Sequence, residues 1–321
     1  MTPVQDYLSR RFARPVMVRQ RLEACLGWMP RVARAGCHRW LWQWPLRHMR
    51  SIPAGIDISP LENGGWRVLS GKRHVSDCVS FADWIGGIDA PLSIVATGPS
   101  ARDYPWEQLR NGERRILGVN GAPSFLREVG VKADAWLISD DTFLPAAARH
   151  FTNASGVPLA TTVSAAAWLA RNSPSELTNR RVTLLERVNQ WHGIPSLPIS
   201  ELIEMNGRSG SPFVFPLGED AKSKVGWSHF PEYGIFSGCT VVFAALQIAV
   251  ALGAKDIEII GMDLSDTGRV YDEGGTPQPS ELSEQYDRYI LPAFELMRGA
   301  LEGSGVRIRN VSKVCPLPPL F

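Results

Sequence analysis

The sequence lacks the patterns that mark several common kinds of site. Its five cysteines include no CxxC or CxxH pair, which argues against a disulfide framework and a zinc site and favours a reducing, cytosolic compartment. Neither the GxGxxG nor the Walker pattern is present, so classical dinucleotide and nucleoside triphosphate sites are disfavoured. None of the six histidines belongs to a Ser-His-Asp pattern, and the last of them is His229.

Long apolar runs are absent as well. The most apolar stretch, residues 241–252, spans 12 residues, whereas a membrane-spanning helix needs roughly 18. The start of the chain is polar and shows no secretory signal. With 321 residues, of which 44% are hydrophobic and 21% charged, the chain has a globular composition and is long enough to bury a large core.

Positive charge is concentrated at the N-terminus. The net charge is only +2, yet residues 1–50 carry ten Arg against two acidic residues, a net of +8. The same segment holds four tryptophans: Trp28, Trp40, Trp42 and Trp44. Arg and Trp at helical spacing suit an anionic membrane surface. Packing on the main domain or on an oligomer partner is the alternative, and nucleic-acid binding is a weaker third one. We expect residues 1–50 to form a basic, Trp-rich helical segment.

The rest of the chain divides at about residue 90. Residues 51–90 contain "ENGGWRVLSGKRHVSD", which is typical of a small hairpin with Gly-rich turns. From residue 91 to 321, apolar strands alternate with helices, which predicts an α/β domain with a mostly parallel, Rossmann-like sheet flanked by helices. The predicted strands are "LSIVAT", "RRILGVN", "ADAWLISDD", "VPLATTVS", "RVTLLERV", "DIEIIGMD" and "VRIRNVS".

Two helices and one insertion complete this prediction. "SGCTVVFAALQIAVALG" has almost no polar side chains and is expected to be a buried helix. "SELSEQYDRYILPAFELMRGALEGSG" has the pattern of a long amphipathic helix. Residues 189–235 are rich in Gly and Pro and have poor periodicity, so we expect a long loop or lid-like insertion near the site.

Small or polar residues directly follow four of the predicted strands. Ligands of open α/β sheets bind outside the carboxyl ends of the strands, so we expect the site there. The four ends are Thr97-Gly98-Pro99-Ser100, Asn120-Gly121, Ser139-Asp140-Asp141 and Gly261-Met262-Asp263. A fifth element is the Ser237-Gly238 turn before the buried helix, because amides at a helix start attract anions. Each signal alone also fits a plain turn or a helix cap. The hypothesis of a binding site therefore depends on all five signals meeting at one place.

The segment "GMDLSDTGRVYDEG" raises the question of a metal. It holds four acidic residues, Asp263, Asp266, Asp272 and Glu273, and carboxylates are the ligands that hard cations prefer. The spacing is not that of an EF-hand loop, and aspartates at strand ends often only cap a turn. We expect no metal and no other cofactor.

The motifs together resemble a known family. The run from "FSGCTVV" through "GMDL", "YDE" and "PSELS" to "ILPAF", with "TGPS", "GVNGAPSFL" and "ADAWLISDDTF", resembles the bacterial lipopolysaccharide-core Kdo transferases of the Kdo-III type. These attach a further 3-deoxy-manno-octulosonic acid (Kdo) to the inner core. The match covers about residues 91–315. More distantly, the chain resembles the mono-domain bacterial sialyltransferases, which use CMP-sialic acid, so the resemblance implies a sialyltransferase-like glycosyltransferase fold.

The resemblance implies an inverting, metal-independent transfer of Kdo from CMP-Kdo to a lipopolysaccharide inner-core acceptor. CMP carries a single phosphate, and no DxD motif stands at a strand end in the usual nucleotide-diphospho-sugar pattern. The implied partners are the CMP-sugar donor, a lipid-linked oligosaccharide and the anionic cytoplasmic surface of the inner membrane, where the protein would be peripheral; nucleic acid is not expected. A transferase for another CMP-activated nonulosonic acid and a non-catalytic nucleotide- or sugar-binding module are the alternatives.

The resemblance also implies roles for matching positions. Those expected to bind the donor are Thr97, Gly98, Pro99, Ser100, Asn120, Ser237, Gly238, Gly261 and Asp263. Tyr271 would hydrogen-bond the leaving phosphate. Because no histidine follows His229, the catalytic base is expected to be a carboxylate, either Glu281 of "PSELS" or Asp140 of "ISDD". Glu281 also suits a capping box and Asp140 a turn cap.

Overall fold

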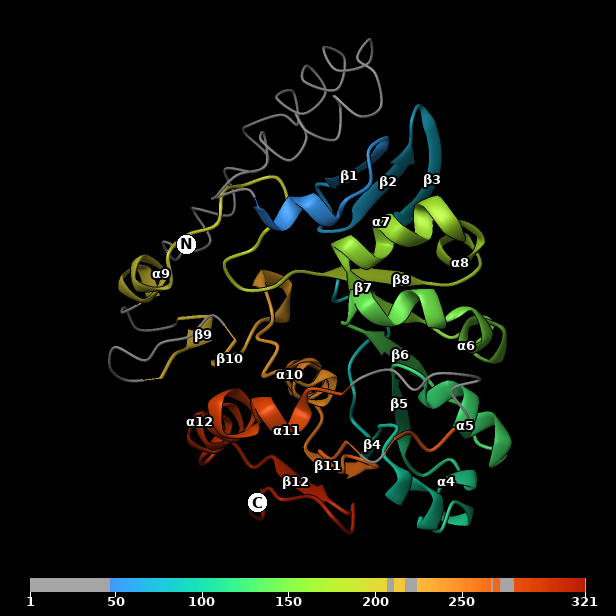
Figure 1. Cartoon of the computed structure of the whole chain (residues 1–321), viewed down its shortest axis with the longest axis vertical. Coiled ribbons are helices and arrows are strands. Elements are labelled where there is room, and N and C mark those ends of the chain that lie inside the picture. The colour runs from blue at the N-terminus through green and yellow to red at the C-terminus, as the bar shows by residue number, and fades with distance from the viewer. Residues whose placement is uncertain (1–46, 207–210, 217–223, 267, 272–279, 321) are drawn as a thin grey trace.

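The computed structural model describes residues 47–320 apart from 207–210, 217–223, 267 and 272–279. The basic, Trp-rich segment expected over residues 1–50 therefore lies almost entirely outside the described residues. Within them, two layers of helices enclose a central sheet (Figure 1).

The central sheet has seven strands in the order β12-β11-β4-β5-β6-β7-β8, and every pairing in it is parallel. The strands are β4 (Leu92–Val95), β5 (Arg115–Val119), β6 (Ala135–Ile138), β7 (Leu159–Thr162), β8 (Val182–Leu185), β11 (Asp256–Ile260) and β12 (Arg307–Asn310). Each lies inside a segment that the sequence predicts as a strand, so the prediction of a mostly parallel α/β sheet is confirmed.

Helices cover both faces of this sheet, which is why its central strands are buried along their whole length. On one face lie α4 (Glu107–Arg110), α5 (Ala122–Glu128), α6 (Ala148–Asn153), α7 (Val163–Asn172) and α8 (Ser175–Thr178); on the other lie α10 (Val241–Ala251), α11 (Leu282–Gln285) and α12 (Leu291–Leu301). Alternate side chains of one strand enter different cores: Ile94 of β4 belongs to the α10 side and Val95 to the α5 side.

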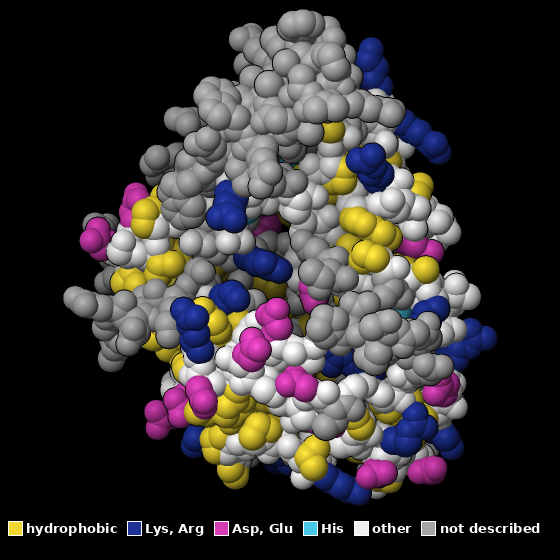
Figure 2. Space-filling model, viewed as in Figure 1, with side chains coloured by type: hydrophobic (Ala, Val, Ile, Leu, Met, Phe, Trp, Pro, Cys, Tyr) yellow, Lys and Arg dark blue, Asp and Glu magenta, His cyan; other side chains and the backbone are white. Residues whose placement is uncertain are grey.

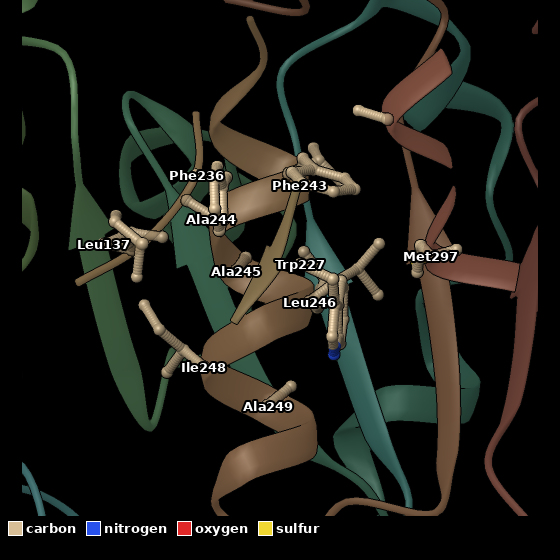
Figure 3. Packing of buried hydrophobic residues seen from close by; sticks show 14 of the residues in the cluster. Leu137, Trp227, Phe236, Phe243, Ala244, Ala245, Leu246, Ile248, Ala249 and Met297 are labelled. Atoms are coloured by element: carbon tan, nitrogen blue, oxygen red, sulfur yellow. The ribbon is translucent and has the colours of Figure 1, made fainter. Parts of the chain in front are cut away.

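Helix α10 is the centre of one core, as the sequence predicts. It packs on β4, β5 and β6, and its side chains point outward on several sides, with Leu137, Trp227 and Met297 around them (Figure 3). Its one buried polar side chain, Gln247, has no exposed surface. The amide oxygen accepts from the Ser228 and Phe236 amides at 3.2 and 3.1 Å, and the amide nitrogen donates to the Phe236 and Phe243 carbonyls at 2.8 and 3.1 Å.

The insertion over residues 189–235 has more structure than the expected long loop. It contains α9 (Ile199–Asn206), the short hairpin β9 (Phe213–Val214) with β10 (Trp227–Ser228), and a 3₁₀ turn (Pro231–Tyr233). Trp191 and Trp227 in it are fully buried. These buried aromatic side chains hold an aperiodic segment in place. Isolated anchors of this kind do not produce a periodic sequence pattern, so the sequence does not predict the structure of the insertion.

Two further elements differ from the sequence-based expectation. Residues 51–90 form a three-stranded antiparallel sheet, β1 (Ile56–Pro60), β2 (Trp66–Ser70) and β3 (Arg73–Cys78), rather than a two-stranded hairpin. The long amphipathic helix is divided into α11 and α12 by a π-helical turn, Tyr286–Ile290. Pro292 follows that turn and has no backbone N–H to donate, so regular helix geometry is interrupted there.

The 3₁₀ turns that remain are short. They are η1 (Arg47–Ser51), η2 (Pro99–Asp103) and η3 (Asp141–Ala146). Of these, η2 begins directly after β4, at the edge of the sheet where the candidate site lies.

Candidate functional site

A cavity of about 570 Å³ opens at the carboxyl ends of four adjacent strands, β11, β4, β5 and β6. The chain leaves β4 toward β5 on one side, while β11 pairs with β4 on the other. The cavity therefore lies at the topological switch point of the sheet, where α/β proteins bind their ligands. Figure 2 shows a hollow in the middle of this face, bordered by both basic and acidic side chains.

Most of the sequence-predicted site residues meet in this cavity. Those that line it are Thr97, Gly98, Asn120, Asp140, Ser237, Gly261, Asp263 and Glu281. Four others do not line it, namely Pro99, Ser100, Gly238 and Tyr271. Pro99 and Gly238 directly neighbour lining residues in the chain, and Ser100 hydrogen-bonds to the lining residue Asp263.

The β4 turn is tied to the end of β11 by Asp263. The Ser100 amide donates to one carboxylate oxygen of Asp263 at 2.9 Å, and the Ser100 hydroxyl donates to the other. Asp263 is only 3% exposed, so this buried charge is compensated within the turn. A Cβ atom on residue 98 would lie 2.6 Å from both the Asp263 carboxylate and the Gly261 carbonyl oxygen. Only glycine is therefore compatible with this close approach.

Asn120 lines the cavity and carries a buried polar atom without a partner among the described residues. Its backbone is fixed on both sides, because its amide donates to the Leu137 carbonyl at 2.9 Å and its carbonyl accepts from the Trp136 indole at 2.7 Å. Its side-chain oxygen is buried and has no hydrogen-bond partner in the described part of the chain. Buried acceptors without partners are rare and costly, so this oxygen is a candidate ligand contact.

Backbone strain is concentrated around the cavity. Four non-glycine residues among those described have a positive φ, and three of them line the cavity: Asn120 (47°), Cys239 (56°) and Leu264 (51°). Such conformations cost roughly 1–3 kcal/mol each and cluster at ligand-binding sites. This clustering supports the cavity as the functional site.

The start of α10 forms another wall of the cavity. Gly238 and Cys239 are two successive residues with positive φ, at 49° and 56°, and Thr240 caps the helix by accepting from the Val242 amide at 3.4 Å. Burial raises the pKa of the Cys239 thiol, while the positive charges of Lys224 and Arg187 oppose that rise. The positive end of the helix dipole thus faces the cavity together with two basic side chains.

Three basic residues of the cavity wall are not among the sequence-predicted site residues: Arg187, Lys224 and Arg269. Arg187 could have been found, because it lies two residues beyond the end of β8, a strand that the sequence predicts. Lys224 lies in the aperiodic insertion, and no local pattern indicates it.

Two carboxylates that the sequence proposes as the base, Glu281 and Asp140, line the same cavity. Glu281 precedes α11, and its carboxylate accepts from the Gln285 side-chain amide at 2.5 Å. Asp140 follows β6 by two residues. The structure thus brings together two candidate bases that lie far apart in the sequence.

Tyr271 does not line this cavity. Its side chain is 9% exposed and lies against Gly121, His150 and Arg149, with ring-centroid distances of 4.9 Å to His150 and 5.1 Å to the Arg149 guanidinium. The expected contact between its phenol and a leaving phosphate stays a prediction. The ring fills the space behind the Asn120-Gly121 turn.

A buried Ser–His pair lies outside the cavity lining and was not expected from the sequence. The Ser124 hydroxyl and the His150 Nδ1 atom are 2.6 Å apart, and the Asn153 side chain donates to the same hydroxyl at 2.8 Å. Burial lowers the pKa of His150 to about 4, so the ring is neutral at pH 7. The cluster joins α5 to α6 and has a structural role.

The described residues contain neither a metal-type cluster nor a helix that could span a membrane. No three His, Cys, Asp or Glu side chains in this part of the chain are grouped so as to hold a metal ion. None of the helices within the described ranges combines the length and apolarity needed to cross a membrane.

Comparisons with known proteins agree with the resemblance drawn from the motifs. Residues 214–316 match the family described as "3-deoxy-D-manno-octulosonic acid transferase WaaZ". A probable 3-deoxy-manno-octulosonic acid transferase of Salmonella typhimurium is 26% identical over 266 residues, which are 76% of this chain and 84% of the relative. The family match includes the start of α10, β11 and Glu281. The resemblance to Kdo transferases is confirmed.

Solved structures are also similar to this chain, among them those of two transferases. The MAf glycosyltransferase of Magnetospirillum magneticum aligns with a TM-score of 0.45 and 15% identity over 72% of this chain, which spans about a third (33%) of that protein. The sialyltransferase CstII of Campylobacter jejuni, in complex with CMP-3FNeuAc, aligns with a TM-score of 0.37 and 12% identity, covering 72% of this chain and 87% of that one.

Proposed function

We propose, on the premise that the chain is a glycosyltransferase similar to Kdo transferases, that it transfers Kdo from CMP-Kdo to a lipopolysaccharide inner-core acceptor. One observation carries the proposal. The segment that matches the Kdo transferase family contributes the α10 start, the β11 end and Glu281 to a single strand-end cavity. The strand ends at Gly98 and Asn120 complete that cavity.

The donor would occupy the cavity between the strand ends and α10. The Thr97-Gly98 turn gives the backbone close access to the nucleotide, supported by Pro99 and Ser100 behind it. The unpartnered Asn120 oxygen would accept a hydrogen bond from the ribose or from the cytosine amino group. Ser237 and Gly238 would present the amides of α10 to an anionic group of the donor, and Gly261 and Asp263 would border the nucleoside.

The proposed reaction is a single displacement. An acceptor hydroxyl oxygen bonds to the anomeric carbon of Kdo, the bond from that carbon to the phosphate oxygen breaks, and CMP leaves, so configuration inverts. The acceptor proton passes to a carboxylate, for which Glu281 is our first candidate and Asp140 our second. Negative charge that develops on the phosphate is stabilised by the dipole of α10. No metal is required by this scheme, because CMP carries one phosphate.

The test is the reaction itself, with the full-length protein, CMP-Kdo and isolated inner-core lipopolysaccharide. We expect acceptor-dependent release of CMP, a product whose mass has increased by one Kdo, and no loss of rate in EDTA. A parallel incubation with CMP-sialic acid tests the alternative donor class. Binding of CMP without any acceptor-dependent release would instead indicate a non-catalytic binding module and would contradict the proposal.

The lipid-linked acceptor gives the N-terminal segment a role. We propose that residues 1–50, with their net charge of +8, bring the enzyme to an anionic membrane surface, at about 1 kcal/mol per nearby Arg before screening. Removing these residues should abolish binding to anionic vesicles and leave transfer to a delipidated acceptor intact. Unchanged vesicle binding would refute this part of the proposal.

A further inference from the structure

The donor in the proposed reaction is a sugar acid, and the inference below rests on that proposed function. We infer that Arg187 and Lys224, together with the first amide of α10, that of Val241, form a subsite for a carboxylate. The subsite selects sugar acids over neutral sugars. Its carboxylate comes either from the donor or from a sugar-acid residue of the acceptor, and the experiments below separate the two.

The two cations reach the same point of the cavity wall from different parts of the chain. Arg187 follows β8, Lys224 precedes β10, and both line the cavity beside Cys239, the second residue before α10. Burial raises the pKa of the Cys239 thiol, and Lys224 and then Arg187 oppose that rise. Glu281 acts on the same thiol in the opposite sense, so two positive charges meet one negative charge here.

Among the residues that the structure describes, neither cation is paired with a carboxylate. No ion pair joins Arg187 or Lys224 to another residue in the described ranges. At the opposite, amino-terminal edge of the sheet, Arg114 lies 3.6 Å from Asp256. Cations that are left unpaired at the wall of a cavity, in a protein that pairs comparable arginines elsewhere, point to an anionic ligand.

The contacts that these two side chains do make leave donors available. One Arg187 nitrogen donates to the Ser139 carbonyl at 3.4 Å, which orients a guanidinium that has five N–H donors. The Lys224 amine lies 4.8 Å from the centroid of the Tyr289 ring and also hydrogen-bonds to the Cys239 thiol. These contacts hold an ammonium that has three N–H donors and leave some of them available. Both heads are thus positioned and still able to bind oxygen atoms.

The tip of α10 adds backbone donors to the same place. The consecutive positive φ angles of Gly238 and Cys239 turn the chain sharply into the helix. The Gly238 amide donates to the Lys224 carbonyl at 2.9 Å, which ties the lysine's own backbone to this turn. The Val241 amide, at the first position of the helix, has no hydrogen-bond partner within the described residues, so it remains free for a ligand.

A carboxylate suits this set of donors better than a neutral hydroxyl. A planar guanidinium binds the two oxygens of a carboxylate side by side, and an ammonium and a helix-tip amide add further charge-assisted hydrogen bonds. The third basic residue of the cavity, Arg269, acts on Asp266, whose pKa is lowered mainly by serine hydroxyls and also by this arginine. Arg269 follows β11 and is not among the charges that act on Cys239, so we assign the carboxylate to Arg187 and Lys224.

The first experiment compares Arg187→Gln and Lys224→Met with two controls that remove an exposed charge away from the cavity, Arg171→Gln and Lys132→Met. CMP affinity, measured by calorimetry, should stay at the wild-type value in all four. If the donor supplies the carboxylate, the KM for CMP-Kdo should rise about tenfold or more in the two cavity variants. If the acceptor supplies the carboxylate, the KM for the acceptor should rise instead. Unchanged KM values, or an equal loss of CMP affinity, would overturn the inference.

The second experiment measures occupancy of the subsite and does not depend on turnover. Alkylation of Cys239 by iodoacetamide is followed by peptide mass spectrometry, with and without free Kdo or its methyl ester. Kdo should slow the alkylation of Cys239 in the wild type and in both controls, whereas the methyl ester should not. In each cavity variant, Kdo should no longer slow the alkylation. Equal protection by the ester would overturn the inference. If the wild type released no CMP while Kdo alone still protected Cys239, the proposed function would fail and the subsite would stand.

Discussion

Gly121 and Tyr271 lie in direct contact: a Cβ atom on residue 121 would be 2.3 Å from the phenolic oxygen of Tyr271. The glycine precedes α5 and follows Asn120, whose side chain lines the cavity. The tyrosine therefore supports the turn that positions Asn120, and the glycine provides the space for the ring. A role in positioning the turn follows from this packing more directly than a role at the reacting atoms.

This contact predicts different outcomes for its two partners. Tyr271→Phe keeps the ring, so turnover should stay within about threefold of the wild type, whereas Gly121→Ala must displace the ring or the turn and should reduce CMP affinity about tenfold. Calorimetric titration with CMP and initial transfer rates measure both. A large loss of turnover in Tyr271→Phe with normal CMP affinity would restore the phenol as a catalytic group.

The sequence predicts the sheet well because parallel strands buried on both faces are continuous apolar runs. All seven strands of the sheet and the buried helix α10 are recognisable in this way. The long helix is harder to predict, since its pattern continues through the π-helical turn before Pro292. The insertion is held by single aromatic anchors such as Trp191 and Trp227, and isolated anchors have no period.

The site is predictable to the extent that it is built from strand ends. Gly98, Asn120 and Asp140 follow their strands within three residues, and they meet because parallel strands end at one edge. Lys224 comes from a segment with no pattern, and its approach to the cavity depends on tertiary packing. Tyr271 shows a second limit: its distance along the chain from Asp263 does not determine on which side of the Asn120-Gly121 turn its ring lies.

The bond between Ser100 and Asp263 supports a second prediction. Asp263→Asn removes the charge and leaves only one oxygen to accept from the Ser100 amide and hydroxyl. We expect a loss of roughly 1–3 kcal/mol in the free energy of unfolding together with weaker CMP binding, because the Gly98 turn is released. Urea unfolding and CMP titration measure the two effects. Asp266→Asn, at an exposed neighbouring acid, is the control and should change neither by as much.

Gln247 supports a third prediction. Replacing it with Leu leaves the Ser228 and Phe236 amides without an acceptor in the core, and each buried orphan costs about 1–3 kcal/mol. The free energy of unfolding should therefore fall by several times the cost of Gln108→Leu, a change at an exposed glutamine of α4. Similar urea midpoints for the two variants would mean that the insertion is not fixed to α10 through this amide.

His150 gives the protein an acid-sensitive stability. Burial lowers its pKa to about 4 from an ordinary value of 6.5, with a smaller contribution from Arg149. Between these values the unfolded chain binds a proton that the folded protein does not. The stabilisation is thus complete above about pH 6.5 and is lost as the pH falls toward 4, by up to about 3 kcal/mol. Urea unfolding at pH 7.5 and 5.0 measures it. His150→Gln should flatten this difference, and an unchanged slope would assign it to other groups.

The choice between Glu281 and Asp140 as base is open to direct measurement. Glu281 lies at the start of α11 with Gln285 as its hydrogen-bond partner, so its carboxylate is oriented at the wall of the cavity. We expect Glu281→Gln to lower kcat by roughly a hundredfold or more, the usual loss for a general base, with little change in the KM for CMP-Kdo. Glu284→Gln, an exposed acid on the same short helix, is the matched control and should keep the wild-type kcat. If Asp140→Asn causes the large loss and Glu281→Gln does not, the proton is accepted at the end of β6, and Glu281 then has only the capping role that its position before α11 allows.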